Sequence, residues 1–438
     1  MPVPTAPACL PLPLPALYAA VKLKGLPEGY ILFHGRLLMS QATDIAIVSG
    51  ARTPMGRYCG KLRDFTAMDL AAVASQEAIR RSGIDAKEFD HAVFGNAQQT
   101  SGDALYGARH VALKAGLPIE TPALTVNRLC GSGMQSLVNA AQMIQLGEAS
   151  TVLAGGMESM SQAPHVVRGA RWGLGLGEGK LEDSLMVALL DTYCGLYMAN
   201  TAELYAEQQG ITREMMDEFS LQSQQKAGAA QKACRLQEEI AAVAIKNKRG
   251  EPTGEQFEKD DHLRPDTTME VLAKLKPAFG KNGTVTAGNA SGIVDGGAAV
   301  VMTTLAQAEK CGLKPMGRIV SWGIAGVDPK IMGSGPVPAS RLALKKAGLS
   351  LGDIDLVEVN EAFAGQYLAV EKELGLDRSK VNVNGGAIAL GHPLGATGTR
   401  LVITVLYELR RRKAKYGLAT ACIGGGQGIA MIVENLQR

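Results

Sequence analysis

The chain has 438 residues, of which 46% are apolar and 20% charged, and its formal net charge is +3. This length allows two or three domains with large cores, and the near-neutral charge excludes the basic footprint of a nucleic-acid-binding protein. No apolar run reaches the roughly 18 residues of a membrane-span candidate. The seven cysteines are scattered without zinc-ligand spacing, which argues against a metal site or disulfide framework and favours a reducing compartment.

The first forty residues differ in composition from the rest. Six prolines between residues 2 and 15 interrupt any helix. The stretch also lacks the basic segment and continuous apolar core of a secretory signal. We expect residues 1–40 to be a disordered extension, an artefact of an upstream start site or, as the lesser alternative, an organellar leader.

From residue 44 onward, short β-branched runs alternate with longer amphipathic runs, which predicts an α/β fold. Strands are expected at residues 44–48, 91–95 and 151–156, and helices at residues 67–81 and 132–146. The same order returns later, with strands at residues 318–321, 356–359 and 417–422 and helices at 339–347 and 397–412. This repetition indicates a duplicated βαβ unit.

Residues 161–290 break the repeated order with a glycine-rich stretch, helical patterns and a charged run, which is typical of an insertion. We therefore predict an N-terminal half formed by residues 41–160 and 291–314. The inserted loop domain covers residues 161–290, and the C-terminal half covers residues 315–438.

Cys130 opens the run Cys130-Gly131-Ser132-Gly133, and the residues after this run have the spacing of an apolar helix face. At a helix N-terminus, free N–H groups and the helix dipole favour the thiolate, so Cys130 is a candidate nucleophile. The small residues after it are expected to leave room for a substrate. The alternative is a small buried apolar residue, which is the commoner role of a lone cysteine.

Three downstream sites shift the balance towards chemistry. His392 lies in the glycine-rich turn Gly391–Gly398, and Cys422 opens a second such turn that contains Gly424. Asn360 stands at the end of an apolar stretch. If the two halves pack face to face, the Cys130 and His392 turns can share one cleft.

Together the segments NRLCGSGMQS, VNEAFA, GHPLGATG and CIGGGQG resemble the thiolases, over about residues 44–434. The resemblance is greatest to the mitochondrial-type 3-ketoacyl-CoA thiolases. It implies a duplicated α-β-α-β-α layered core of two similar halves with an inserted loop domain. It also implies a homodimer or homotetramer.

The resemblance further implies ping-pong acyl transfer between 3-ketoacyl-CoA and CoA, as in fatty-acid β-oxidation. Cys130 would carry the acyl group, His392 would accept its proton, and Cys422 would act as acid and base at C2 of acetyl-CoA. Asn360, through a water, and His392 would form one oxyanion hole. The N–H groups of Cys130 and Gly424 would form the other.

Four further residues match family positions that contact CoA: Arg264, Thr267, Ser291 and Met198. CoA would be a substrate, and no resident cofactor or metal is expected. Tyr197 replaces the histidine that is common in acetoacetyl-CoA-specific members. This difference favours longer or mixed 3-ketoacyl chains over the alternative, an acetoacetyl-CoA-forming acetyltransferase.

Other classes fit less well. A condensing ketosynthase would not need the second thiol, Cys422, and a dinucleotide-dependent oxidoreductase would need a GxGxxG turn after the first strand. An inactive thiolase-like binding protein would not need to retain all four polar side chains. The expected partners are acyl-CoA and CoA, without nucleic acid or a membrane span. The expected location is the cytoplasm, with the mitochondrial matrix as the alternative in a eukaryote.

Overall fold

The computed structural model describes residues 30–33, 36–39, 44–177, 179–247 and 249–438. It divides into two compact units, Met1–Thr43 and Asp44–Arg438. In the first unit, β1 (Tyr30–Phe33) and β2 (Arg36–Met39) form an antiparallel hairpin. The remainder of the expected extension lies outside the described residues.

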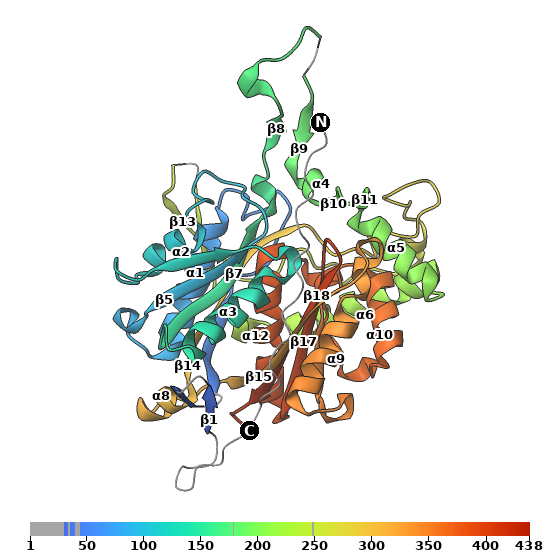
Figure 1. The fold of residues 1–438 in the computed structure, drawn as a ribbon. Helices are drawn as coiled ribbons and strands as arrows, with labels where there is room; N and C mark the ends of the chain where they lie inside the picture. The colour runs from blue at the N-terminus through green and yellow to red at the C-terminus, as the bar shows by residue number, and fades with distance from the viewer. Residues whose placement is uncertain (1–29, 34–35, 40–43, 178, 248) are drawn as a thin grey trace, which may run out of the picture. The chain divides into compact units, whose positions relative to one another are not determined.

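The second unit is built on one ten-stranded mixed sheet, to which both parts of the chain contribute strands in the same order (Figure 1). The N-terminal part has the order β3-β14-β7-β5-β6 and the C-terminal part has β15-β18-β17-β16, and the two parts meet where β15 pairs with β3. The strands are β3 (Ile45–Arg52), β4 (Gly56–Arg57), β5 (His91–Asn96), β6 (Ala123–Val126), β7 (Thr151–Ser159), β14 (Val294–Thr304), β15 (Gly317–Gly326), β16 (Leu356–Val359), β17 (Tyr416–Ile423) and β18 (Gln427–Asn435).

The strand order reproduces the duplication that the sequence predicts. In each part the first strand pairs antiparallel with the last, β3 with β14 and β15 with β18. In the sheet, the last strand of each part is followed by the strand of this sheet that precedes it in the chain, β7 or β17. Beyond that strand lies β5 in the N-terminal part and β16 in the C-terminal part. The two long last strands, β14 and β18, were not expected from the sequence.

Helices complete five layers, as expected for a duplicated α/β core. Helix α1 packs on β3 and β14, α9 packs on β15 and β18, and α3 and α12 pack on each other between the two halves of the sheet (Figure 1). The helices of the core are α1 (Ala67–Ser82), α2 (Gly107–Ala115), α3 (Ser132–Gln145), α8 (Leu305–Lys310), α9 (Pro336–Ala347), α10 (Ala364–Leu374), α11 (Ala387–Leu390) and α12 (Leu394–Arg412).

Local sequence explains where the key helices begin and which faces they bury. Thr66 and Asp69 form a capping box at the start of α1, and Gly83 ends that helix in the left-handed conformation. The predicted apolar face of α3 is buried, from Met134 to Ile144. Helix α12 is buried along most of its length because both halves of the sheet cover it. It begins at Leu394, three residues earlier than predicted.

Residues between β7 and β14 form the insertion. Its elements are β8 (His165–Val167), β9 (Leu181–Asp183), α4 (Ser184–Ala188), β10 (Leu190–Asp191), β11 (Leu196–Tyr197), α5 (Met198–Gln208), α6 (Arg213–Lys232), β12 (Val243–Lys246), β13 (Pro252–Phe257) and α7 (Met269–Ala273). Within the described part of the chain, no helix combines the length and apolarity needed to cross a bilayer.

Candidate active site

Cys130 lies in a short 3-10 turn, η2 (Leu129–Gly131), between the edge strand β6 and helix α3. Leu129 has a φ of 45°, a left-handed conformation that is strained for a branched side chain. The Leu129 N–H donates to Asn127 Oδ1 at 2.9 Å, and Ser132 Oγ donates to the Leu129 carbonyl at 2.7 Å. These bonds hold the strained turn, and with it the thiol, at the start of α3.

The glycines that flank this turn make room for protein atoms, which corrects the expectation that they leave space for a substrate. A Cβ at Gly131 would lie 2.5 Å from Ile423 Cδ1, and a Cβ at Gly133 would lie 2.6 Å from the Gly395 carbonyl oxygen. Both distances are shorter than van der Waals contact. The glycines therefore let the Cys130 turn pack directly on β17 and α12.

The second thiol and the Gly424 amide lie beside Cys130. Burial raises the pKa of the Cys130 thiol to about 11, the N–H groups of Gly424 and Cys130 itself act to lower it, and the Glu158 carboxylate acts to raise it. Burial, together with the nearby Cys130 sulfur, raises the pKa of Cys422 well above its usual value. Cys422 is buried, whereas Cys130 is partly exposed.

These pKa directions correct one part of the sequence argument. The helix N-terminus was expected to favour the Cys130 thiolate, but desolvation outweighs the two N–H groups at the sulfur. The resting residue is therefore a neutral thiol at neutral pH. It needs a base to remove its proton when it reacts.

His392 lies directly before α12, in the place that corresponds to that of Cys130 before α3. Thr397 Oγ1 lies 2.6 Å from His392 Nδ1 and donates its only proton to the Pro393 carbonyl at 3.0 Å. The hydroxyl must therefore accept from His392 Nδ1–H. This tautomer leaves Nε2 unprotonated and able to accept, which is the form of a general base.

Asn360 faces that nitrogen from the end of β16. With the His392 proton on Nδ1, Asn360 Nδ2 donates to Nε2 at 3.3 Å, and the Asn360 backbone N–H donates to the Thr420 carbonyl of β17 at 2.9 Å. Asn360 Oδ1 is buried and has no hydrogen-bond partner among the described residues. Burial, followed by the Arg400 charge, lowers the pKa of His392 to about 3, so its imidazole is neutral at rest.

Two of the four predicted CoA-binding residues lie at this site. Met198 packs in a cluster with Cys422, and its sulfur would lie 3.1 Å from a Cβ at Gly424. The Ser291 N–H donates to the Ala362 carbonyl at 2.9 Å, in the segment that follows Asn360. Both residues are partly exposed.

Among the described residues, no hydrogen bond joins the other two, Arg264 and Thr267, to Met198 or Ser291. Arg264 is exposed, its N–H donates to Gln224 Oε1 at 2.9 Å, and its carbonyl accepts from Thr267 Oγ1 at 2.8 Å. The neighbouring His262 ring packs against Gly292, whose carbonyl accepts from the His392 N–H at 2.9 Å. His262 therefore connects the Arg264 loop to the site.

Sequence reasoning did not single out Thr397 and Glu158. Thr397 follows His392 by five residues. Because the helix was expected to begin only at residue 397, the sequence did not indicate that Thr397 lies in its first turn, close to His392. Glu158 is the one charged residue in the fully buried strand β7, and that anomaly was a usable signal.

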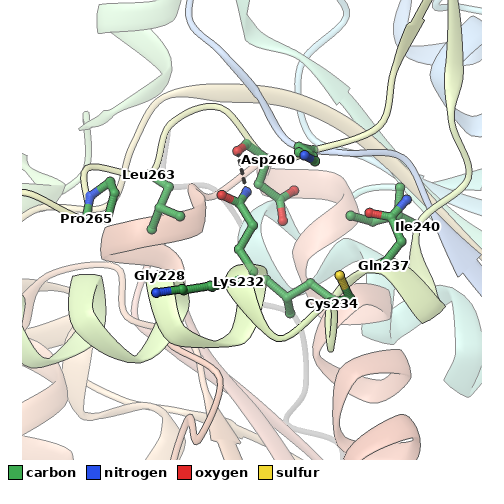
Figure 2. Close-up of a pocket in the computed structure, with 11 residues that line it drawn as sticks. Gly228, Lys232, Cys234, Gln237, Ile240, Asp260, Leu263 and Pro265 are labelled. Carbon is green, nitrogen blue, oxygen red and sulfur yellow. Dashed lines mark hydrogen bonds between the residues drawn. The ribbon is translucent and has the colours of Figure 1, made fainter.

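A cavity of about 400 Å³ lies elsewhere in the fold, between the end of α6 and residues 259–265. Figure 2 shows Gly228, Lys232 and Cys234 on one side of it and Asp260, Leu263 and Pro265 on the other. It contains none of the residues discussed above. Among the described side chains, no group of three His, Cys, Asp or Glu could hold a metal ion.

Comparison with known proteins decides the family. Residues 45–306 match the family "Thiolase, N-terminal domain", and residues 313–435 match "Thiolase, C-terminal domain". The chain belongs to the thiolase family. This confirms the resemblance carried by the segments around Cys130, Asn360, His392 and Cys422.

Similar thiolases come from distant organisms. The chain is 53% identical over 398 residues to the human "3-ketoacyl-CoA thiolase, mitochondrial". This alignment covers 91% of this chain and 100% of the human protein. It is 49% identical over 393 residues to an "Acetyl-CoA acetyltransferase" of Cupriavidus necator, covering 90% and 99%.

A crystal structure of the human mitochondrial 3-ketoacyl-CoA thiolase in complex with CoA superimposes with a TM-score of 0.87 at 52% identity. It covers 90% of this chain and 98% of that one. The thiolase fold predicted from the sequence is therefore confirmed.

Proposed function

We propose that this thiolase is an acyltransferase that moves an acyl group between 3-ketoacyl-CoA and CoA through a thioester on Cys130. One observation carries the proposal: the Cys130 thiol, the Cys422 thiol and the Gly424 N–H lie together at the end of β17. Acyl transfer through a thiol needs a nucleophile, a proton donor for the leaving carbon and an oxyanion donor, and these three groups supply them.

In the first half-reaction, His392 Nε2 takes the Cys130 proton as the sulfur attacks the 3-keto carbon. The N–H groups of Cys130 and Gly424 stabilise the oxyanion of the tetrahedral intermediate. The C2–C3 bond then breaks, and its electron pair becomes the enolate of acetyl-CoA. Asn360 and His392 face the thioester oxygen, and Cys422 gives its proton to C2. The high pKa of Cys422 keeps that proton in place until the carbanion develops.

In the second half-reaction, the thiol of CoA attacks the acyl-Cys130 thioester. The CoA proton passes to the Cys422 thiolate that the first half-reaction left behind. Cys130 leaves as the thiolate and takes back its proton from His392, so both thiols and the imidazole return to their starting forms. Thioester exchange leaves the number of thioesters unchanged, so this step is close to isoenergetic. CoA is thus a substrate, and no resident cofactor is needed. We assign its nucleotide end to Arg264 and Thr267 and its pantetheine to Ser291 and Met198.

For the substrate we propose 3-ketoacyl-CoA of the β-oxidation series. The resemblance at Tyr197 and the name of the human relative support this choice. The alternative, formation of acetoacetyl-CoA from two acetyl-CoA, uses the same groups in reverse and is supported by the name of the Cupriavidus relative. The ratio of kcat/KM for acetoacetyl-CoA to that for a long-chain 3-ketoacyl-CoA separates the two.

For assembly we propose a homodimer or homotetramer. What supports it is the exposed edge of the sheet at β6, where large apolar side chains reach solvent: Leu105, Tyr106, Ile119 and Leu124. For location we keep the cytoplasm, with the mitochondrial matrix as the eukaryotic alternative favoured by the relative's name. Light scattering of the purified protein tests the first proposal, and imaging of the tagged chain tests the second.

The activity itself is tested by following loss of a 3-ketoacyl-CoA in the presence of CoA. Cys130→Ser and His392→Ala should abolish turnover. Cys311→Ser should not, because that cysteine is exposed at the end of α8. If wild-type protein leaves the 3-ketoacyl-CoA intact, or if Cys130→Ser turns over normally, the proposed function is wrong.

A further inference from the structure

The Cys130 and His392 turns come from different halves of the chain, and their helices meet through glycine. A Cβ at Gly398 would lie 2.3 Å from the Met134 backbone nitrogen, and Thr399 Oγ1 donates to the Gly133 carbonyl at 2.9 Å. Helices α3 and α12 therefore touch backbone to backbone. Such close packing brings the two turns together, but it does not by itself orient the first residues of α12.

Glu158 adds a polar connection at this junction. Its Oε2 accepts from the N–H of Gly395 at 2.8 Å and of Ala97 at 3.1 Å. Its Oε1 accepts from the N–H of Gln98 and from Asn96 Nδ2, both at 3.0 Å. The side chain belongs to β7 and is fully buried. One carboxylate thus joins the end of β5, strand β7 and the first turn of α12.

The Gly395 N–H lies in the first turn of α12 and has no acceptor within that helix. A negative charge is stabilised at such a helix start. Each carboxylate oxygen receives two donors, which favours the ionised, acceptor-only form. Burial opposes these donors and raises the pKa of the Glu158 carboxyl to about 7, so the charge is complete only above that pH. An amide in its place would set an NH2 against two N–H groups in either orientation. A neutral, isosteric side chain therefore cannot reproduce the contact.

Glu158 is also the charged group that acts on the nucleophile. The titratable groups that influence the Cys130 thiol are Glu158 from β7 and, through its own shifted pKa, Cys422 from β17. His392 is neutral, and Arg400 is the charge that acts on it. Removal of the Glu158 charge should therefore lower the pKa of Cys130.

We propose that Glu158 is a positioning residue for acyl transfer: by holding the first turn of α12, its carboxylate fixes the His392 ring relative to the Cys130 turn. The inference rests on the proposed roles of Cys130 and His392. Glu158 touches neither the substrate nor the reacting atoms in this scheme. Its contribution should therefore appear in kcat and leave KM nearly unchanged.

The test compares Glu158→Gln with Glu408→Gln in the full-length protein. Glu408 is a buried carboxylate at the other end of α12, where it pairs with Arg411 and Arg412. We expect Glu158→Gln to lower kcat about 10- to 100-fold, because a displacement of about 1 Å has an effect of that order. KM should change less than about twofold. Glu408→Gln should lower thermal stability and leave kcat unchanged.

A second readout separates positioning from a general loss of stability. The rate of Cys130 alkylation should reach its half-maximum at lower pH in Glu158→Gln than in wild type, whereas Glu408→Gln should not move it. Glu158→Asp keeps the charge, so it should keep the wild-type pH profile while its kcat falls. If Glu158→Gln does not fold, the Asp variant alone decides.

Wild-type kcat in either the Gln or the Asp variant would overturn the inference while leaving the proposed function intact. A wild-type protein without thiolysis activity would instead refute the proposed function. In that case the alkylation profile still reports whether Glu158 acts on Cys130, and an unshifted profile in Glu158→Gln would overturn the inference as well.

Discussion

Thr397→Val tests the tautomer on which the general base depends. Valine has nearly the shape of threonine but lacks the hydroxyl that accepts from His392 Nδ1–H at 2.6 Å. The ring can escape an unpaired N–H by moving its proton to Nε2. Asn360 can then turn its unpartnered Oδ1 towards that proton. In this state the lone pair no longer faces the reaction, and His392 cannot act as the base.

The size of the effect follows from the lost hydrogen bond. A buried donor without a partner costs about 1–3 kcal/mol, and each 1.4 kcal/mol is about a factor of ten in population. The productive tautomer, and with it kcat, should therefore fall about 5- to 150-fold. KM should change little because Thr397 contacts the imidazole, with no assigned role in binding CoA.

Steady-state thiolysis measures this directly, with Thr404→Val as the matched control. Thr404 lies on the same helix, is 3% exposed, and its hydroxyl has no partner among the described residues. Its replacement should leave kcat unchanged and should not lower the melting temperature. A folded Thr397→Val protein with kcat within about twofold of wild type would refute the tautomer argument.

Four other predictions concern the two thiols, the imidazole and the glycines. Cys422→Ser should still form an acyl adduct on Cys130 but lose thiolysis and condensation, and normal turnover would exclude Cys422 as the acid. Because burial raises the pKa of Cys130 to about 11, its alkylation rate should still be rising at pH 10, and a plateau by pH 8 would contradict the neutral thiol. The pKa of His392 is lowered to about 3, so its contribution to stability is complete above the unfolded value of 6.5 and is lost as pH falls towards 3. The urea midpoint of wild type should therefore fall more steeply between pH 7 and pH 4 than that of His392→Asn, and parallel slopes would refute this. Gly131→Ala should destabilise by about 1–3 kcal/mol through the Ile423 contact, whereas Gly102→Ala, in open space, should not; equal urea midpoints for the two variants would refute the packing argument.

Much of the fold could be predicted because local patterns and final structure agree. Helix α1 has its capping box and terminal glycine in the sequence, and the apolar face of α3 is periodic. Strand β14 was missed because its first residues, Val294 to Ala299, are small and include two glycines, which resemble a turn. In the structure those glycines allow β14 to pack against α1 and against the Met55 and Pro393 side chains. Only tertiary contacts show this.

Local sequence likewise predicts part of the candidate site, and only tertiary contacts show the rest. Glycine-framed turns marked Cys130, His392 and Cys422, and the end of an apolar stretch marked Asn360, since these signals are short and local. The reversal of the expected Cys130 pKa could not be read from sequence, because it depends on how many atoms from α12 and β17 exclude water from the sulfur. The four hydrogen bonds to the Glu158 carboxylate could not be predicted from the sequence either, because one of the donors lies 237 residues away in the chain.

Intact-mass spectrometry after incubation with acetyl-CoA shows whether Cys130 carries the acyl group. We expect one acetyl group per chain, mapped to Cys130 by peptide analysis, absent in Cys130→Ala and removed when CoA is added. An unmodified wild-type protein, or an adduct that persists in Cys130→Ala, would exclude Cys130 as the acyl carrier.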